Sequence, residues 1–159
     1  MFYLFLKLLH IASVIIFLGN ILTGLFWMRV AVKARDLKII SHSIKAVIRS
    51  DQIFNIPGLV MITTFGIFAA VVGKHPLLRT GWIFWSLILL TISGFVFGRK
   101  ISPLQKKIYT LTSVPEENNF DWPYFRKVFI EWEKWVLVAF LMPVIAFILM
   151  ILKVPAKTF

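Results

Sequence analysis

The sequence predicts an all-α membrane protein, a four-helix transmembrane bundle with both termini outside and two basic cytoplasmic loops that carry short amphipathic helices. Three observations lead to this fold class. Of the 159 residues, 59% are hydrophobic, above the roughly 45–50% apolar content of soluble domains. Four windows are long and apolar enough to cross a hydrocarbon core of about 30 Å. Most of the basic residues fall in two of the loops between these windows.

The four predicted spans are residues 8–28, 54–72, 82–97 and 135–152, and they make one domain, residues 1–159. Prolines inside two of the windows are compatible with spans, since neighbouring helices can satisfy the backbone groups that a proline leaves free. We expect Pro57 to bend the second span near its inner end. The chain has no cysteine, so disulfides and thiolate metal sites are excluded.

The distribution of charge predicts the topology. The net charge is +11, and 13 of the 18 lysines and arginines lie in the loops that follow the first and third spans. By the positive-inside rule these two loops are cytoplasmic. The basic residues are therefore expected to meet anionic lipid head groups and not nucleic acid. The bacterial cytoplasmic (inner) membrane is the expected location, with several passes through it.

Tryptophans mark the expected membrane boundaries, because their amphipathic rings favour the interface. Trp82 and Trp85 are expected at the outer boundary. Trp27, Trp132 and Trp135 are expected at the inner one.

The first cytoplasmic loop has a helical pattern of apolar residues at Leu37, Ile40, Ile44 and Val47, with basic residues between them. This amphipathic pattern predicts a helix that either extends the first span or lies on the membrane surface.

The second cytoplasmic loop contains "SPLQ". Ser102 as N-cap, Pro103 at the first helical position and Gln105 reaching back predict a short separate helix that ends near Thr112. The acidic stretch of residues 113–123 is predicted to be a loop. Asp121 is expected to cap a helix that starts near Pro123, continues into the fourth span and protrudes from the bilayer.

The first span carries its small and polar residues on one side. At 100° per residue, one side of this span carries Lys7, His10, Ser13, Phe17, Asn20, Gly24 and Trp27. Such a stripe is expected to face protein and not lipid.

His10 is the main candidate for chemistry, because an ionisable group inside a membrane is costly unless it is partnered or used. A neutral imidazole is a common axial ligand of haem iron, which makes His10 the candidate metal ligand. The alternative is a neutral histidine that bonds a neighbour such as Ser13 or Asn20, or that stays wet near the interface. Lys7 either snorkels outward or holds an anionic group such as a haem propionate.

A second ligand is less well defined. His75, in the outer loop, lies on the same predicted side as His10 and is either the second ligand or an ordinary loop residue. His42 is cytoplasmic and cannot reach His10.

Other site types lack candidates. None of the seven acidic residues lies in a predicted span, so the sequence predicts no carboxylate relay or cation site within the membrane. It also has no nucleotide-binding glycine loop, serine nucleophile elbow or zinc-binding His-Glu spacing, which argues against hydrolase and nucleotide-driven mechanisms.

Five segments, "LKLLHIASVIIFLGN", "DQIFNIPGLVMITTFG", "GWIFWSLIL", "SPLQKKI" and "LMILKVP", resemble a family of uncharacterised bacterial integral membrane proteins with four predicted helices. The resemblance runs along almost the whole chain. More distantly, the chain is similar to the HemJ-type membrane protoporphyrinogen oxidases and the CopD-type copper-resistance membrane proteins.

Resemblance to the HemJ type implies that His10 matches a haem-binding histidine and that "FNIPG" matches a Pro-Gly second helix. The chain departs from that pattern at two places. It has Lys33 or a neighbour where a further histidine is expected, and Trp85 and Ser86 where a lysine is expected. Haem binding therefore follows from the resemblance more directly than protoporphyrinogen oxidation does.

Two functional hypotheses follow. In the first, the bundle binds haem b for a redox or electron-transfer role, with His10 as axial ligand, Ser13 and Gly24 making room for the porphyrin, and Lys7 and His75 nearby. In the second, the protein is a non-catalytic scaffold or assembly subunit of a larger membrane complex, with the protruding helix as partner surface. Besides the lipid bilayer, the expected partners are a membrane protein complex or further copies of the chain.

Overall fold

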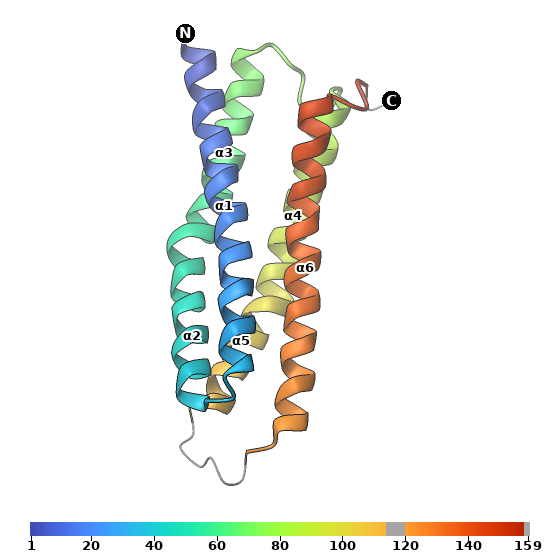
Figure 1. Cartoon of the computed structure of the whole chain (residues 1–159). Coiled ribbons are helices and arrows are strands. Elements are labelled where there is room, and N and C mark those ends of the chain that lie inside the picture. Colours follow the sequence, from blue (N-terminus) through green and yellow to red (C-terminus); the bar gives the residue numbers. More distant parts are fainter. Residues whose placement is uncertain (114–119, 158–159) are drawn as a thin grey trace.

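The structure, a computed structural model, describes residues 1–113 and 120–157. Its elements run in this order along the chain: α1 (Phe2–Lys33), α2 (Leu37–Ser50), η1 (Asp51–Asn55), α3 (Ile56–Val72), α4 (Gly81–Val96), η2 (Phe97–Ile101), α5 (Ser102–Thr112) and α6 (Trp122–Leu152). Within the described ranges the chain is helical and has no strand (Figure 1). The predicted all-α fold class is confirmed.

Four long rods make up the bundle. Since the π-helical turn η1 joins α2 to α3 and η2 joins α4 to α5, the rods are Phe2–Lys33, Leu37–Val72, Gly81–Thr112 and Trp122–Leu152. Each is long and apolar enough to cross a membrane. Both termini lie at the same end of the bundle (Figure 1).

The two π-helical turns have a common cause in the sequence. Each ends two residues before a proline, η1 before Pro57 and η2 before Pro103. A proline has no N–H to donate to the carbonyl four residues earlier, which here lies inside the π turn. The wider π turn is the local form that the helix takes next to each proline. The π-helical turn η1 lies directly before the position where the sequence predicted a bend at Pro57.

The first cytoplasmic segment folds in neither of the two predicted ways. It does not extend α1 and does not lie apart on the membrane surface. Arg35 adopts a positive φ of 52° and reverses the chain, and Asp36 caps α2 by accepting hydrogen bonds from the backbone N–H groups of Lys38 and Ile39. The predicted apolar face of α2 is confirmed as its buried face. It packs on α1 and α5, which lie alongside it in the bundle.

The predicted capping box at Ser102 is also wrong. Ser102 makes no capping hydrogen bond, because the helix arrives continuously from α4 through η2 and has no free N–H groups to cap. Gln105 is instead drawn into the core, where its amide nitrogen donates to Asp51. The predicted end of this helix at Thr112 is confirmed.

The start of α6 follows the prediction. Asp121 accepts a hydrogen bond from the backbone N–H of Tyr124 at 2.9 Å, and the helix begins at Trp122. Residues 114–119 of the predicted acidic loop lie outside the described residues.

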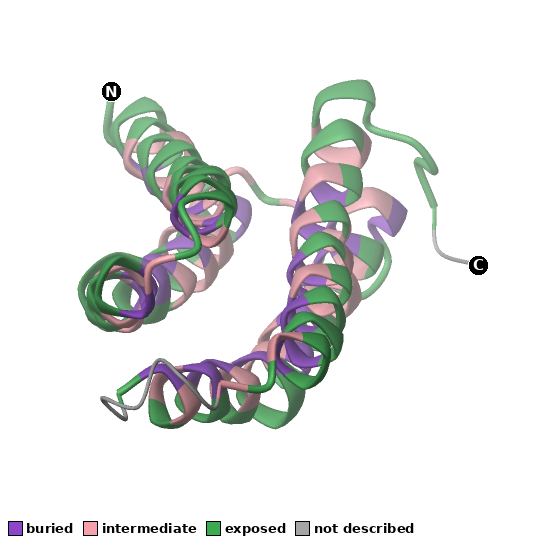
Figure 2. Cartoon of the chain, turned by 60° about the horizontal axis from the view of Figure 1, so that its bottom comes forward, coloured by how far each residue is buried: buried purple, intermediate pink, exposed green. Residues whose placement is uncertain are grey.

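The best-packed part of the bundle is the end away from the termini. One core cluster of 15 buried residues joins α1, α2, α5 and α6 there, and it includes Met28, Ile44, Ile108 and Trp132. Trp132 is only 1% exposed, so the prediction that it anchors at the inner interface is wrong. Figure 2 shows buried residues on the sides of the helices that face each other and exposed residues around the outside.

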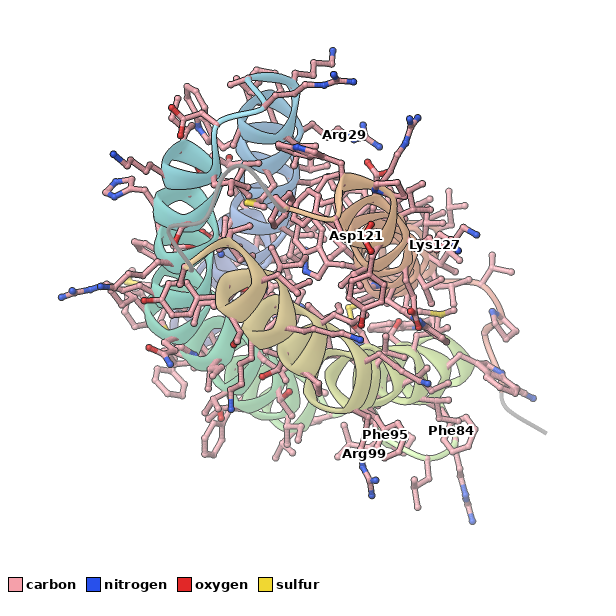
Figure 3. All side chains as sticks on the ribbon, turned by 90° about the horizontal axis from the view of Figure 1, so that it is seen from below. Arg29, Phe84, Phe95, Arg99, Asp121 and Lys127 are labelled. Atoms are coloured by element: carbon pink, nitrogen blue, oxygen red, sulfur yellow. The ribbon has the colours of Figure 1, made fainter. Side chains whose placement is uncertain are left out.

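The charges mark where the bilayer lies along the rods. On α1, Lys7 and Arg29 are 22 residues apart, or about 33 Å along a helix, which matches a hydrocarbon core of about 30 Å. Arg29 pairs with Glu133 of α6, and Arg99 lies 5.5 Å from the ring of Phe95, both on the outside of the bundle (Figure 3). A bilayer between Lys7 and Arg29 would leave the well-packed end on the basic side, which the positive-inside rule assigns to the cytoplasm.

The outer end of the bundle is divided into two helix pairs. In this half, α1 packs on α3 and α4 packs on α6, while contact between the pairs is sparse. The core there is small and consists of Phe17, Ile62 and Leu90 with a few partly buried neighbours. A cavity lies between the pairs.

Candidate functional site

The cavity between the two helix pairs has a volume of about 470 Å³, within the range of about 300–1,000 Å³ that is usual for small-molecule and cofactor sites. Its walls come from all four rods and from the loop before α4. Most of the lining side chains are apolar. The ionisable ones are Tyr3, Lys7, His10, His75 and Lys153.

His10 is held in this cavity by a specific contact with α3. Its Nδ1 atom lies 2.9 Å from the carbonyl oxygen of Ile62. Because a carbonyl oxygen can only accept, Nδ1 carries the proton and Nε2 keeps its lone pair. No second hydrogen bond joins this ring to another residue in the described part of the chain. Metal-binding histidines commonly have this arrangement, with one ring N–H on a backbone carbonyl and the other nitrogen free for the metal.

Gly66 provides the space that the His10 ring occupies. A Cβ atom at position 66 would lie 3.0 Å from both Cε1 and Nδ1 of His10. The absence of a side chain there allows α1 and α3 to approach with the imidazole between them. The position of the ring is therefore determined by Ile62 on one side and Gly66 on the other.

Two other predicted site residues line the same cavity. Lys7 lies one turn before His10 and is exposed. His75 lies in the outer loop, with its ring 5.7 Å from that of Trp82 in an edge-on arrangement. The structure therefore brings His10, Lys7 and His75 to one cavity.

Two predicted site residues lie elsewhere. Ser13 is buried, but its hydroxyl donates to the carbonyl of Leu9 within α1 and does not line the cavity. Gly24 lies near the other end of α1, where its Cα faces Val47 of α2, and it lines a second, smaller cavity. Trp27, at the end of the predicted stripe, is 57% exposed. His42 is exposed on α2, as predicted.

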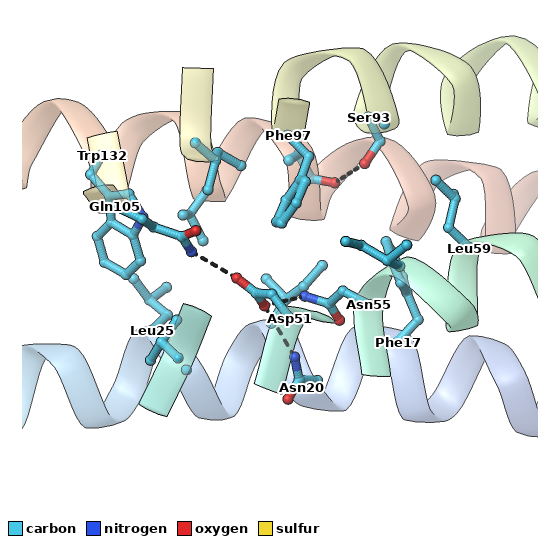
Figure 4. Close-up of a pocket in the computed structure, with 18 residues that line it drawn as sticks. Phe17, Asn20, Leu25, Asp51, Asn55, Leu59, Ser93, Phe97, Gln105 and Trp132 are labelled. Atoms are coloured by element: carbon cyan, nitrogen blue, oxygen red, sulfur yellow. Dashed lines mark hydrogen bonds between the residues drawn. The ribbon is translucent and has the colours of Figure 1, made fainter. Parts of the chain in front are cut away.

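The second cavity, of about 60 Å³, contains a buried carboxylate. Asp51, only 6% exposed, accepts hydrogen bonds from three amide groups, those of Asn20, Asn55 and Gln105 (Figure 4). Asp51 lies three residues before the predicted span 54–72, within the continuous rod Leu37–Val72. Nothing in the sequence indicated its burial, because a basic stretch precedes it.

The model of a family described as predicted integral membrane proteins (DUF2269) matches residues 4–154 of the chain. The chain belongs to this family. The match covers the four rods apart from the first two residues of α1, and it covers the lining of both cavities apart from Tyr3. No curated protein and no solved structure matches the chain.

As a member of this family, the protein is an integral, multi-pass membrane protein in contact with lipid. The exposed side chains along its rods agree with this, because large apolar residues point outward there, among them Ile15, Phe68, Ile92 and Leu141. The more distant similarity to the HemJ and CopD types stays a prediction.

The sequence did not identify several residues of the cavity between the two helix pairs. Gly66 gave only a weak signal, a glycine inside an apolar span, and nothing local in the sequence connects it to His10. For Lys153, which also lines this cavity, the sequence indicated only a basic residue on the outer side. Among the described residues, no group of three or more histidine, cysteine or acidic side chains could hold a metal ion.

Proposed function

We propose that this membrane protein binds haem b in the cavity between its two helix pairs, with His10 as axial ligand, and serves a redox or electron-transfer role in a bacterial cytoplasmic membrane. The observation that carries the proposal is the state of His10. Its Nδ1–H is used by the carbonyl of Ile62, which leaves Nε2 as the ring atom available to iron.

The residues around the cavity fit such a group. A porphyrin is flat and apolar with two carboxylates at one edge, and the cavity has mainly apolar walls. Lys7 and Lys153, whose ammonium groups suit carboxylates, line the cavity from the outer ends of α1 and α6. The volume of about 470 Å³ falls in the range of cofactor sites.

The protein's contribution would be to position and tune the iron. His10 would supply one ligand, and its bond to Ile62 would fix the ring and raise its basicity. His75 is the candidate for a second ligand, since it lines the same cavity. Two histidine ligands would suit electron transfer, whereas one would leave an open position for catalysis or sensing.

The test is an absorption spectrum, oxidised and reduced, of the full chain purified in mild detergent from cells supplied with a haem precursor. A Soret band with reduced b-type peaks is expected for the native protein and for His42→Ala, whose histidine is exposed on α2. His10→Ala is expected to lose the band while keeping its helix content by circular dichroism. Full haem in His10→Ala would contradict the proposal.

His75→Ala addresses the coordination number. If His75 is a ligand, this variant keeps haem but changes from a low-spin to a high-spin spectrum. An unchanged spectrum would leave His10 as the sole histidine ligand. A colourless native protein that co-purifies with a larger complex would favour the scaffold hypothesis instead.

A further inference from the structure

The cluster around Asp51 is separate from the haem proposal and has its own cavity. Phe17 lines both cavities and lies between them. The smaller cavity is bounded by α1, α6 and both π-helical turns, because Asp51 and Asn55 belong to η1 while Phe97 and Ile101 belong to η2 (Figure 4). π-Helical turns occur often at functional sites.

The carboxylate of Asp51 has no positive partner. Its Oδ1 accepts from Asn20 at 3.2 Å and from Asn55 at 2.6 Å, and its Oδ2 accepts from Gln105 at 2.7 Å. All three donors are neutral amides. Asp51 is the one charged side chain among the described residues that line this cavity.

The contacts leave room for one more bond to the carboxylate. A carboxylate has about four lone-pair positions, of which two are used on Oδ1 and one on Oδ2. One position on Oδ2 is therefore unused. A ligand that brings a positive charge to it would also offset part of the cost of burying the anion.

Two further polar atoms at this cavity are buried and unpaired. Among the described residues, Oδ1 of Asn55 and Nε1 of Trp132 have no hydrogen-bond partner, although the residues are only 4% and 1% exposed. Because the carboxylate can only accept, the amide nitrogen of Asn55 must face Asp51 and its oxygen is the free atom. Native structures leave few such groups unpaired unless a water or an ion meets them.

We propose that Asp51 and Asn55 bind a monovalent metal cation, Na⁺ or K⁺, in this cavity. Carboxylate and amide oxygens are the ligands that hard cations prefer, and a single carboxylate balances a single positive charge. The volume of about 60 Å³ has space for about four water-sized groups. That is enough for a cation and some waters, and the N–H of Trp132 can donate to one of the waters.

The site lies near the middle of the rods, beside the stretch of α1 between Lys7 and Arg29. Asp51 follows Arg49, an exposed basic residue of the inner boundary, by two positions, and Asn20 lies within that stretch of α1. A buried charge at this depth is a functional candidate by default. The cation would be bound at η1, and the carboxylate that binds it is also joined to α1 by Asn20 and to α5 by Gln105.

The test compares thermal unfolding of the purified full chain in sodium, potassium and choline chloride at equal ionic strength. Sodium or potassium is expected to raise the Tm saturably above its value in choline, by about 3 °C or more when the cation concentration exceeds Kd tenfold. Asp51→Asn should abolish the difference. Glu131→Gln, which removes an exposed acid of α6, should keep it.

A direct binding measurement covers the case in which Asp51→Asn does not fold. Equilibrium dialysis with radiolabelled sodium or rubidium should show saturable binding to the native protein, weakened about tenfold or more in Asn55→Ala. The proposal is overturned if the native protein shows no saturable binding, or if Asp51→Asn responds to cations as the native protein does. It is also overturned if acidification alone raises the Tm with no difference between cations, because a proton would then be the ligand.

Discussion

The hydroxyl group of Ser93 on α4 donates a 2.8 Å hydrogen bond to the carbonyl oxygen of Ala139 on α6. Ala139 stands four residues before Pro143, whose missing N–H leaves that carbonyl without its usual helical donor. The serine of one helix therefore completes the backbone of its neighbour. This is how a membrane helix tolerates an internal proline.

The first prediction concerns this pair. Ser93→Ala should lower the free energy of unfolding by about 0.5–2 kcal/mol, because the buried Ala139 carbonyl then loses its partner. In a Pro143→Ala background the loss should be smaller, since the new backbone N–H at position 143 can take that carbonyl. A double-mutant cycle in detergent measures the coupling. Thr91→Ala is the control, because its hydroxyl bonds within its own helix; additive losses would contradict the assignment.

The second prediction concerns the space that Gly66 leaves for the ring of His10. Gly66→Ala places a methyl group about 3 Å from two ring atoms of His10, so the imidazole must shift and haem retention should fall although the ligand itself is intact. Gly19→Ala, which meets nothing within 4 Å, is the matched control. The haem-to-protein ratio of the purified variants measures the effect. Equal ratios would show that the contact with Gly66 does not position the ring for haem.

The third prediction concerns the turn after α1. Asp36 accepts from the backbone N–H of Lys38 at 2.7 Å and of Ile39 at 3.1 Å, so Asp36→Ala should lower the free energy of unfolding by about 1 kcal/mol. Asp36→Asn keeps an acceptor and should be nearly neutral. Chemical unfolding followed by circular dichroism distinguishes the two, and equal losses in both variants would assign the effect to charge.

The fourth prediction concerns the ion pair between Arg29 and Glu133. Its side chains are 51% and 22% exposed, so solvent and salt screen the attraction. Glu133→Gln should change the free energy of unfolding by no more than about 1 kcal/mol, and the difference should shrink at high salt. A larger loss that persists in salt would mean that the pair is shielded in the assembled protein.

The fifth prediction compares the two halves of the bundle. Ile108 is fully buried in the larger core cluster. Ile108→Ala should therefore lower the free energy of unfolding by about 2–5 kcal/mol. Ile92 is 42% exposed on the lipid-facing side, and Ile92→Ala should lose much less. Unfolding of both variants in the same detergent provides the comparison, and a larger loss at Ile92 would place the main core in the membrane half.

Much of the fold could be predicted from local sequence. The apolar windows, the cap at Asp121, the end of α5 at Thr112 and the buried face of α2 depend on residues close to one another in the chain. Local sequence patterns therefore predict them. The continuous connections from α2 to α3 and from α4 to α5 could not be predicted in this way. A helix continues through Ser102, where the sequence predicted a start, and through Asp51, three residues before the predicted start of the second span.

Some residues of the candidate sites could likewise be predicted from local sequence, and others could not. His10, Lys7 and His75 could be named from the sequence because ionisable groups stand out in or beside an apolar span. Ser13 and Gly24 were predicted with them because they share one side of α1. Ser13 lines neither cavity, and Gly24 lines the smaller one, at a different height along α1. The four-residue cluster at Asp51 joins three rods, so no stretch of sequence contains it.

The sequence by itself determined that this is a multi-pass helical membrane protein with a basic side, because hydrophobicity and charge are properties of composition and order. Only the tertiary structure decided that the rods pair as α1 with α3 and α4 with α6, that the cavity opens between the pairs, and that Asp51 is buried among amides. These features depend on which side chains meet across helices. A carboxylate that looks like part of a solvated basic loop is buried once three rods close around it.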